Sequence, residues 1–255
     1  MTIKISQNKI NILTKLITKK LRVRQNNTSL IDEKSMLREN IIAWLDRYDI
    51  KNYKLMPNIE NSSSQEPWND YKSPDSVGFI VDVEGDVNLS DKNLKHIPVK
   101  FNIVNGNFDC DNNELSNLEF CPETVNGFFD CENNKLTSLE FCPEIIHGNF
   151  YCGHNKLISM EFCPKIINGD FYFDYNKLTS LKYCPTTVRG NFYCDNNELT
   201  SLEFCPEIIS GDFYCSKNDL TSLQFCPEII HGNFSCRHND LTNLEFFPET
   251  INSYF

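Results

Sequence analysis

A unit of 21 residues repeats seven times without a gap between Gly106 and Asn252. One full copy, residues 190–210, reads GNFYCDNNELTSLEFCPEIIS, and a weaker eighth copy precedes the seven at residues 85–105. Repetition at a fixed short period is typical of a solenoid, in which each coil contacts mainly its neighbours. The repeat therefore predicts a stack of eight coils and favours an extended binding surface over a catalytic pocket. The predicted coils start at residues 85, 106, 127, 148, 169, 190, 211 and 232.

Each coil has an internal pattern, counted here from its opening glycine as position 1. Phenylalanine at position 3 and mostly cysteine at position 5 alternate with polar residues, which predicts a short strand paired in parallel with its neighbours. Asparagine at position 8 is expected to satisfy backbone groups that the turn would leave buried and unpaired. Leucine at positions 10 and 13 (Met160 in one coil) and valine or isoleucine at position 20 complete the core. Proline at position 17 excludes a helix and favours an extended return path.

All twelve cysteines lie in two columns of the repeat, at positions 5 and 16. Metal binding, disulfides and buried free thiols are all compatible with such columns. Phe173 replaces one cysteine at position 5, and Phe247 replaces one at position 16. A disulfide or metal framework would tend to lose both partners together, whereas an apolar column accepts either residue. The exchange favours buried free thiols, no bound metal or cofactor, and a reducing compartment such as the cytoplasm.

The pattern F-x-C-x-x-N-x-L resembles the second part of the leucine-rich-repeat signature. The short repeat, with proline where longer repeats have a helix, resembles the leucine-rich repeats of large phages and giant viruses and, more distantly, those of bacterial effectors. WLDRYDIKNY and VDVEGDVNLSDKNLKHIPVKF resemble the N-terminal module of these proteins, so that the resemblance covers residue 39 to the end of the chain. It implies an α+β protein: a leucine-rich-repeat solenoid with a parallel sheet on its concave face. The aromatic residue at position 15 departs from the small residue common in this family.

Strand residues at positions 2, 4 and 6 are expected to face outward on the concave side. Tyrosine occupies position 4 in four consecutive coils, and carboxylates surround it. Such a surface is typical of protein recognition and would prefer a basic or amphipathic partner. The alternative is that tyrosine merely suits exposed strands. The candidate partner-binding residues are Tyr151, Tyr172, Tyr193, Tyr214, Asp109, Asp130, Asp170, Asp174, Asp195 and Asp212.

The N-terminal part differs in charge from the repeats. Residues 1–60 carry a net charge of +6, while residues 85–255 carry −13. Residues 1–56 are predicted to form a helical cap with apolar stripes over residues 10–20 and 32–48. Because residues 1–31 contain seven basic and no acidic side chains, weak membrane-surface contact through residues 1–25, targeting, or nucleic-acid binding are alternatives. Residues 57–76 are predicted to form a flexible insert, followed by the solenoid domain at 77–255.

The repeats are acidic enough to repel phosphate backbones, which argues against nucleic acid as their partner. No motif places a nucleophile, a phosphate loop or a set of metal ligands, so no catalytic residue, cofactor or metal is predicted. The sequence therefore predicts a non-enzymatic, cytoplasmic protein-binding scaffold. The alternative is a host-directed effector or inhibitor from a virus or intracellular bacterium, localised to the host cytoplasm by its basic N-terminal helix.

Overall fold

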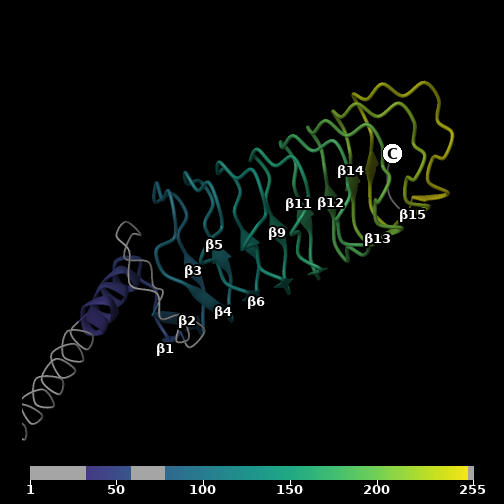
Figure 1. Cartoon of the computed structure of the whole chain (residues 1–255). Helices are drawn as coiled ribbons and strands as arrows, with labels where there is room; N and C mark the ends of the chain where they lie inside the picture. Colours follow the sequence, from purple (N-terminus) through teal and green to yellow (C-terminus); the bar gives the residue numbers. More distant parts are fainter. Residues whose placement is uncertain (1–32, 59–77, 252–255) are drawn as a thin grey trace, which may run out of the picture. The chain divides into compact units, whose positions relative to one another are not determined.

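A computed structural model of the chain describes residues 33–58 and 78–251 (Figure 1). The helix predicted over residues 10–20 and nearly all of the predicted insert at residues 57–76 lie outside the described residues. The chain divides into two compact units, Met1–Trp44 and Leu45–Phe255. A helix occupies residues 33–47, in agreement with the second predicted helix. Its role as a cap stays a prediction.

The larger unit contains a β-solenoid of about eight turns, one for each predicted coil (Figure 1). Positions 3 and 4 of successive coils form an eight-stranded parallel sheet in which equivalent residues lie opposite one another, 21 residues apart. This sheet confirms the parallel pairing that the alternation predicts. Its strands are β3 (Val87–Asn88), β5 (Phe108–Asp109), β7 (Phe129–Asp130), β9 (Phe150–Tyr151), β11 (Phe171–Tyr172), β12 (Phe192–Tyr193), β14 (Phe213–Tyr214) and β16 (Phe234–Ser235).

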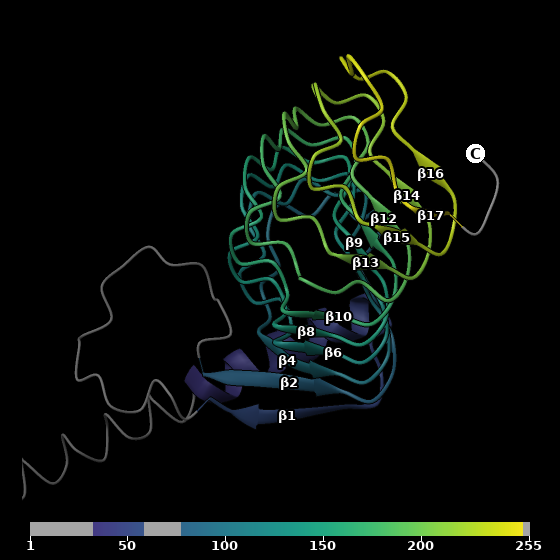
Figure 2. The ribbon, with the colours of Figure 1, turned by 90° about the vertical axis from the view of Figure 1, so that its right-hand side faces the viewer.

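The return path also forms strands, on another side of each coil (Figure 2). The strand pairing is interrupted near Val188, which makes only an isolated bridge to Ile209. One sheet of six strands contains β1 (Tyr53–Pro57), β2 (Phe79–Val83), β4 (Phe101–Val104), β6 (Thr124–Val125), β8 (Ile145–Ile146) and β10 (Ile166–Ile167). A sheet of three strands contains β13 (Ile208–Ile209), β15 (Ile229–Ile230) and β17 (Thr250–Ile251).

The first strand of the six-stranded sheet, β1, lies where the sequence predicts the end of the helical segment. Helix was expected through residue 56, but β1 is extended and pairs antiparallel with β2, with Leu55 opposite Val81. Backbone pairing with β2 outweighs the helical tendency of the short segment before the insert. β2 then pairs in parallel with β4 and begins the solenoid sheet.

The core of each coil is closed by apolar columns. Phenylalanine at position 3, leucine at positions 10 and 13, and valine or isoleucine at position 20 are fully or almost fully buried in the inner coils. Phe173 is fully buried in the position-5 column, and its ring centroid lies 4.5 Å from that of Phe171. All twelve cysteines are free thiols. The predicted burial of the thiols is therefore confirmed at position 5, except at Cys236, which is half-buried. At position 16 only Cys121 is buried, and the other five cysteines are half-buried.

The asparagines at position 8 form a continuous hydrogen-bonded ladder through the solenoid. Asn176 is buried, and its Nδ2 donates to the carbonyl oxygens of Cys152 in the previous coil and of Phe173 and Asp174 in its own coil, at 3.0–3.3 Å. Its Oδ1 accepts the backbone N–H of Leu157 at 3.0 Å. Every hydrogen-bonding group of the amide is therefore occupied, as the pattern predicts.

The glycine at position 1 is required by close packing between coils rather than by its backbone angle, because no described glycine has a positive φ. A Cβ placed on Gly190 would lie 2.7 Å from the backbone nitrogen of Asp170 in the previous coil. In this contact, the backbone N–H of Asn191 also donates to Asp170 Oδ1 at 2.7 Å. Any side chain at position 1 would force the coils apart.

Candidate protein-binding surfaces

The four tyrosines at position 4 (the tyrosine ladder: Tyr151, Tyr172, Tyr193 and Tyr214) stack along the outer face of the eight-stranded sheet. Successive ring centroids lie 4.9, 4.4 and 4.7 Å apart, with interplanar angles of 20°, 9° and 4°. The rings point outward because the preceding phenylalanine in each strand points into the core. Stacking covers the faces of the inner rings, so their edges are left for contact with a partner. The hydroxyl group of Tyr151 already accepts a hydrogen bond from Asn149 Nδ2 at 2.6 Å.

Carboxylates continue the same face beyond the tyrosines, in the second and third coils. Oxygen atoms of Asp109, Asp111 and Asp130 lie within 4.8 Å of one another. Burial, and then the neighbouring carboxylates, raises the pKa of Asp130 to about 7 and that of Asp111 to about 6. Burial likewise raises the pKa of Glu132 to about 7. These carboxylates are crowded, and no cation neutralises them within the cluster.

The column at position 6 brings further carboxylates onto this face. Gly153 has no side chain, and a Cβ there would lie 2.9 Å from both Glu132 Oε1 and Asp174 Oδ1. The pKa values of Asp174 and Asp195 are also raised by burial. His154 Nε2 lies 3.8 Å from Asp174 Oδ2, so one histidine is placed to offset part of this charge when protonated.

Three of the sequence-predicted residues have a role in holding the coils together. Asp170 Oδ1 and Asp212 Oδ1 accept backbone N–H groups of Asn191 and Asn233 in the next coil, at 2.7 and 2.6 Å. Asp195 Oδ1 accepts the backbone N–H of Ser216 in the same way, at 2.5 Å. Their carboxylates stabilise the stacking of coils, so they are less available to a partner. Asp109, Asp130, Asp174 and Asp195 lie with the tyrosines on the outer side of the sheet. Asp111 and Glu132 were missed, although their place in the position-6 column could have indicated them.

Among the residues that the structure describes, Asp109, Asp111 and Asp130 are the one group of three potential metal ligands. All three are partly exposed, and oxygen-only ligands would suit a hard cation such as Ca²⁺ or Mg²⁺. Two of the three side chains already accept backbone hydrogen bonds: Asp109 Oδ1 from Asp111, and Asp130 Oδ1 from Glu132. The structure contains no feature that selects an ion over the other uses of these carboxylates.

A second surface lies at position 15, where every complete repeat from 106 onward carries an aromatic residue. The side chains are exposed in six of the seven coils, and each backbone has a positive φ of 61–75°. These residues, the aromatic row, are Phe120, Phe141, Phe162, Tyr183, Phe204, Phe225 and Phe246. The sequence showed their bulk, but it did not show their orientation, because alternation does not extend into this turn.

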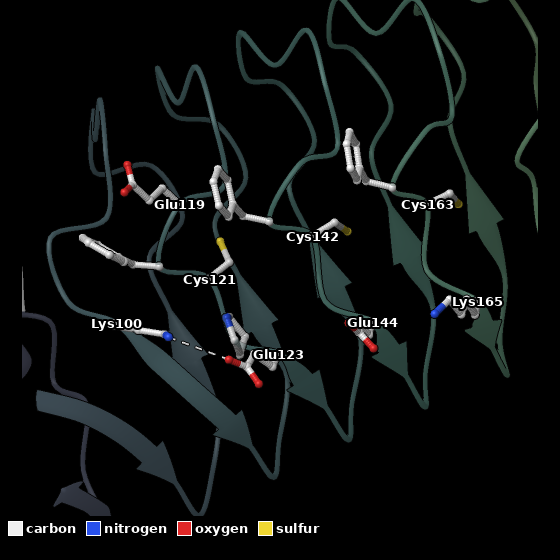
Figure 3. A pocket seen from close by; sticks show the side chains of 12 residues that line it. Lys100, Glu119, Cys121, Glu123, Cys142, Glu144, Cys163 and Lys165 are labelled. Carbon is white, nitrogen blue, oxygen red and sulfur yellow. Dashed lines mark ion pairs between the residues drawn. The ribbon is translucent and has the colours of Figure 1, made fainter. Parts of the chain in front are cut away.

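Two grooves run along the aromatic row. The first, of about 500 Å³, is lined by the aromatic residues of three coils and by neighbouring cysteines at position 16 (Figure 3). The second, of about 930 Å³, lies along the next three coils. In the first groove Lys100 Nζ lies 3.8 Å from Glu123 Oε1, and Glu119, Glu144 and Lys165 also reach it (Figure 3).

Within the described residues, no helix combines the length and the apolar character needed to cross a lipid bilayer. Comparison of the chain with protein-family models, with curated protein sequences and with solved structures gives no match.

Proposed function

We infer that this protein is a non-enzymatic binding scaffold that recognises a basic or amphipathic protein partner through the tyrosine ladder and the adjacent carboxylates. In this proposal the solenoid is a short leucine-rich repeat, and the eight-stranded sheet is its concave, partner-binding face. The buried leucines at positions 10 and 13 and the asparagine ladder support this relation, because they fill the roles that the leucine-rich-repeat signature assigns to them.

The observation that carries the proposal is the pairing of an aromatic platform with the crowded carboxylates Asp111, Asp130 and Glu132, whose pKa values are raised by burial and by neighbouring carboxylates. The four stacked rings offer a rigid, amphipathic surface that loses little conformational entropy on binding. Beside them, the raised pKa values of Asp130 and Glu132 show that ionisation of these groups is unfavourable in the free protein. A lysine or arginine side chain of a partner would stabilise the ionised form and gain binding energy.

The test is a pull-down from cytosol with the wild-type protein and a variant with Tyr151→Ala, Tyr172→Ala, Tyr193→Ala and Tyr214→Ala. A protein retained by the wild type and lost by this variant would establish the ladder as the binding surface. A matched control changes four exposed threonines at position 11 of the repeat to alanine: Thr137, Thr179, Thr200 and Thr221. The control should retain the partner.

Loss of stacking could weaken the fold, so a second variant with the same four tyrosines changed to phenylalanine keeps the rings and removes only the hydroxyl groups. Binding should fall in this variant too, by less than in the alanine variant, while the melting temperature stays close to that of the wild type. Identical retained proteins for the wild type and the folded alanine variant would contradict the proposal. The retained partner should also dissociate more readily at pH 5 than at pH 8, where Asp130 and Glu132 are more fully ionised.

A further inference from the structure

The aromatic row combines two features that reduce stability, backbone strain and exposure. Phe141, Phe162 and Tyr183 have φ values of 67°, 68° and 75°, in the left-handed region that glycine and asparagine adopt most readily. A bulky side chain is unfavourable in this conformation. Even so, each of the seven coils carries phenylalanine or tyrosine there, so the requirements of the turn itself do not explain the choice of residue.

Packing inside the protein does not explain it either. The side chains of Phe141, Phe162 and Phe204 are 51–55% exposed, whereas those of the phenylalanines at position 3 are buried. Ring contacts join the phenylalanines of the core and the tyrosines of the ladder, but no ring contact joins two members of the aromatic row in the described part of the chain. About half of each of these three side chains is therefore accessible to a partner.

Both sides of the aromatic row are acidic. Positions 14 and 18 in the seven coils carry ten glutamates and two lysines, all exposed, which gives a net charge of −8. The row itself shows how a cation would sit: Lys182 Nζ lies 4.9 Å from the centroid of the Tyr183 ring. The glutamates are Glu119, Glu140, Glu161, Glu203, Glu245, Glu123, Glu144, Glu207, Glu228 and Glu249.

We propose that the aromatic row is a second docking surface and that it binds a basic amphipathic α-helix of a partner protein. Apolar side chains of the helix enter the two grooves, and its lysine or arginine side chains meet the glutamates on both sides. This surface is separate from the tyrosine ladder, so the proposal does not depend on the function proposed for that ladder.

The spacing of the coils favours a helix over an extended peptide. Hydrogen bonds between coils persist next to the row, as from Glu144 N–H to the carbonyl oxygen of Glu123 at 3.0 Å, so the rings repeat about every 4.8 Å. The turns of an α-helix repeat every ~5.4 Å, so side chains on one face of the helix stay close to successive rings over about four coils. In an extended strand, side chains on one face repeat every ~6.8 Å, so they no longer match the rings after about two coils. The seven coils span ~29 Å, which corresponds to a helix of about 20 residues.

The negative charge beside the aromatic row disfavours three other ligands that an apolar surface could bind. Anionic lipid and nucleic acid are repelled by the flanking glutamates. A second copy of the solenoid would place one acidic row against another, which is also unfavourable. A cationic segment with an apolar face is the class of partner that both features of the surface attract.

The direct test uses the full-length protein and two synthetic helical peptides of about 20 residues, one built from leucine and lysine and the other from leucine and glutamate. Binding is measured by fluorescence anisotropy. The leucine–lysine peptide should bind the wild type, and its Kd should rise at least about tenfold in a variant with Phe141→Asn, Phe162→Asn, Phe204→Asn and Phe225→Asn. Asparagine tolerates the left-handed conformation, so this variant should melt at or above the wild-type temperature.

Two controls separate this surface from the others. The variant with four tyrosines changed to alanine removes any binding of the leucine–lysine peptide at the tyrosine ladder; in this background the four asparagine changes should still raise the Kd at least about tenfold. Binding that is lost with the tyrosines and is unaffected by the asparagine changes would assign the peptide to the tyrosine ladder and overturn the proposal. Vesicles of phosphatidylcholine and phosphatidylserine should not bind through the row. The proposal would be overturned by equal affinity for both peptides or by no binding of the leucine–lysine peptide. A clearly lower melting temperature of the asparagine variant would also overturn it, because the aromatic residues would then be needed for the stability of the fold.

Discussion

In the seven coils that start at residues 106 to 232, two turns adopt a left-handed backbone, and they differ in the contacts that stabilise them. At the asparagine turn, position 7 has φ values of 49–56° in these seven coils, with asparagine, histidine, tyrosine or lysine at that position. The next residue, asparagine, makes the buried hydrogen bonds described above. At the aromatic turn, position 15 has φ values of 61–75°, and its side chain is mostly exposed.

The two turns differ in how strongly the fold depends on the residue type at the strained position. At the asparagine turn the strained position accepts several residue types, because the fold depends on the amide that follows it. At the aromatic turn the strained position always carries a ring, and in six of the seven coils about half of that residue's surface stays exposed. A ring that recurs at a strained and half-exposed position is consistent with the docking surface proposed above.

The largest effect is expected at the asparagine turn. Asn176→Ala removes four hydrogen bonds and leaves the carbonyl oxygens of Cys152 and Phe173 without this partner in a buried site. Stability should fall by about 1–3 kcal/mol, measured as the shift of the urea unfolding midpoint. Thr179→Ala, exposed in the same coil, is the control and should change stability by less than about 0.5 kcal/mol. A result near zero for Asn176→Ala would remove the distinction between the turns.

Thiol reactivity should follow the same division. The cysteines at position 5 precede the asparagine turn and are buried in the inner coils, whereas Cys142, Cys163 and Cys205 at position 16 adjoin the aromatic turn and are half-buried. Alkylation of the native protein at pH 8, followed by peptide mass spectrometry, should modify position 16 at least about tenfold faster than Cys131 and Cys152. Burial raises the pKa of both groups, so all rates should be slower than in the denatured protein. Uniform labelling would contradict the difference in exposure.

An effect of intermediate size is expected from pH, because the raised pKa of Asp130 on the eight-stranded sheet makes the stability of the protein depend on pH. Asp130 has a pKa of about 7 in the folded protein, well above its ordinary value, so the folded state binds more protons than the unfolded state between about pH 4 and 7. Stability should therefore fall as pH rises through this interval. After allowance for solvent screening, Asp130→Asn should raise stability by about 1 kcal/mol at pH 8. Thermal unfolding at pH 5 and pH 8 should show a smaller difference for this variant than for the wild type; an unchanged difference would assign the effect to other groups.

The smallest effect is expected at the aromatic turn. Phe162→Asn places a residue that tolerates the left-handed conformation at an exposed site, and stability should stay the same or rise by about 0.5 kcal/mol. Phe162→Ala removes the ring but keeps a Cβ in the strained conformation, so it separates the ring from the backbone. A loss of more than about 1 kcal/mol in both variants would make the ring a packing element and weaken the comparison.

The repeat period and the apolar columns were sufficient to predict the coils, the parallel sheet and the buried asparagines, because a period of 21 residues places the same contact in every coil. The second set of strands was predicted only as an extended path, since two-residue strands such as Ile145–Ile146 are too short to show an alternation. The orientation of Phe141 and its equivalents was not predictable, because it depends on a positive φ that is unusual for a bulky residue. The roles of Asp170 and Asp212 in coil stacking also depend on backbone contacts with the next coil.

The tyrosine ladder has an optical consequence. Aromatic transition dipoles in nearly parallel rings 4.4–4.9 Å apart couple electronically, and the coupling depends steeply on their distance and angle. The four rings therefore form a built-in chromophore array whose near-ultraviolet circular dichroism reports the register between four successive coils. A change of that signal, without attached labels, would reveal any bending or twisting of the solenoid by a bound molecule.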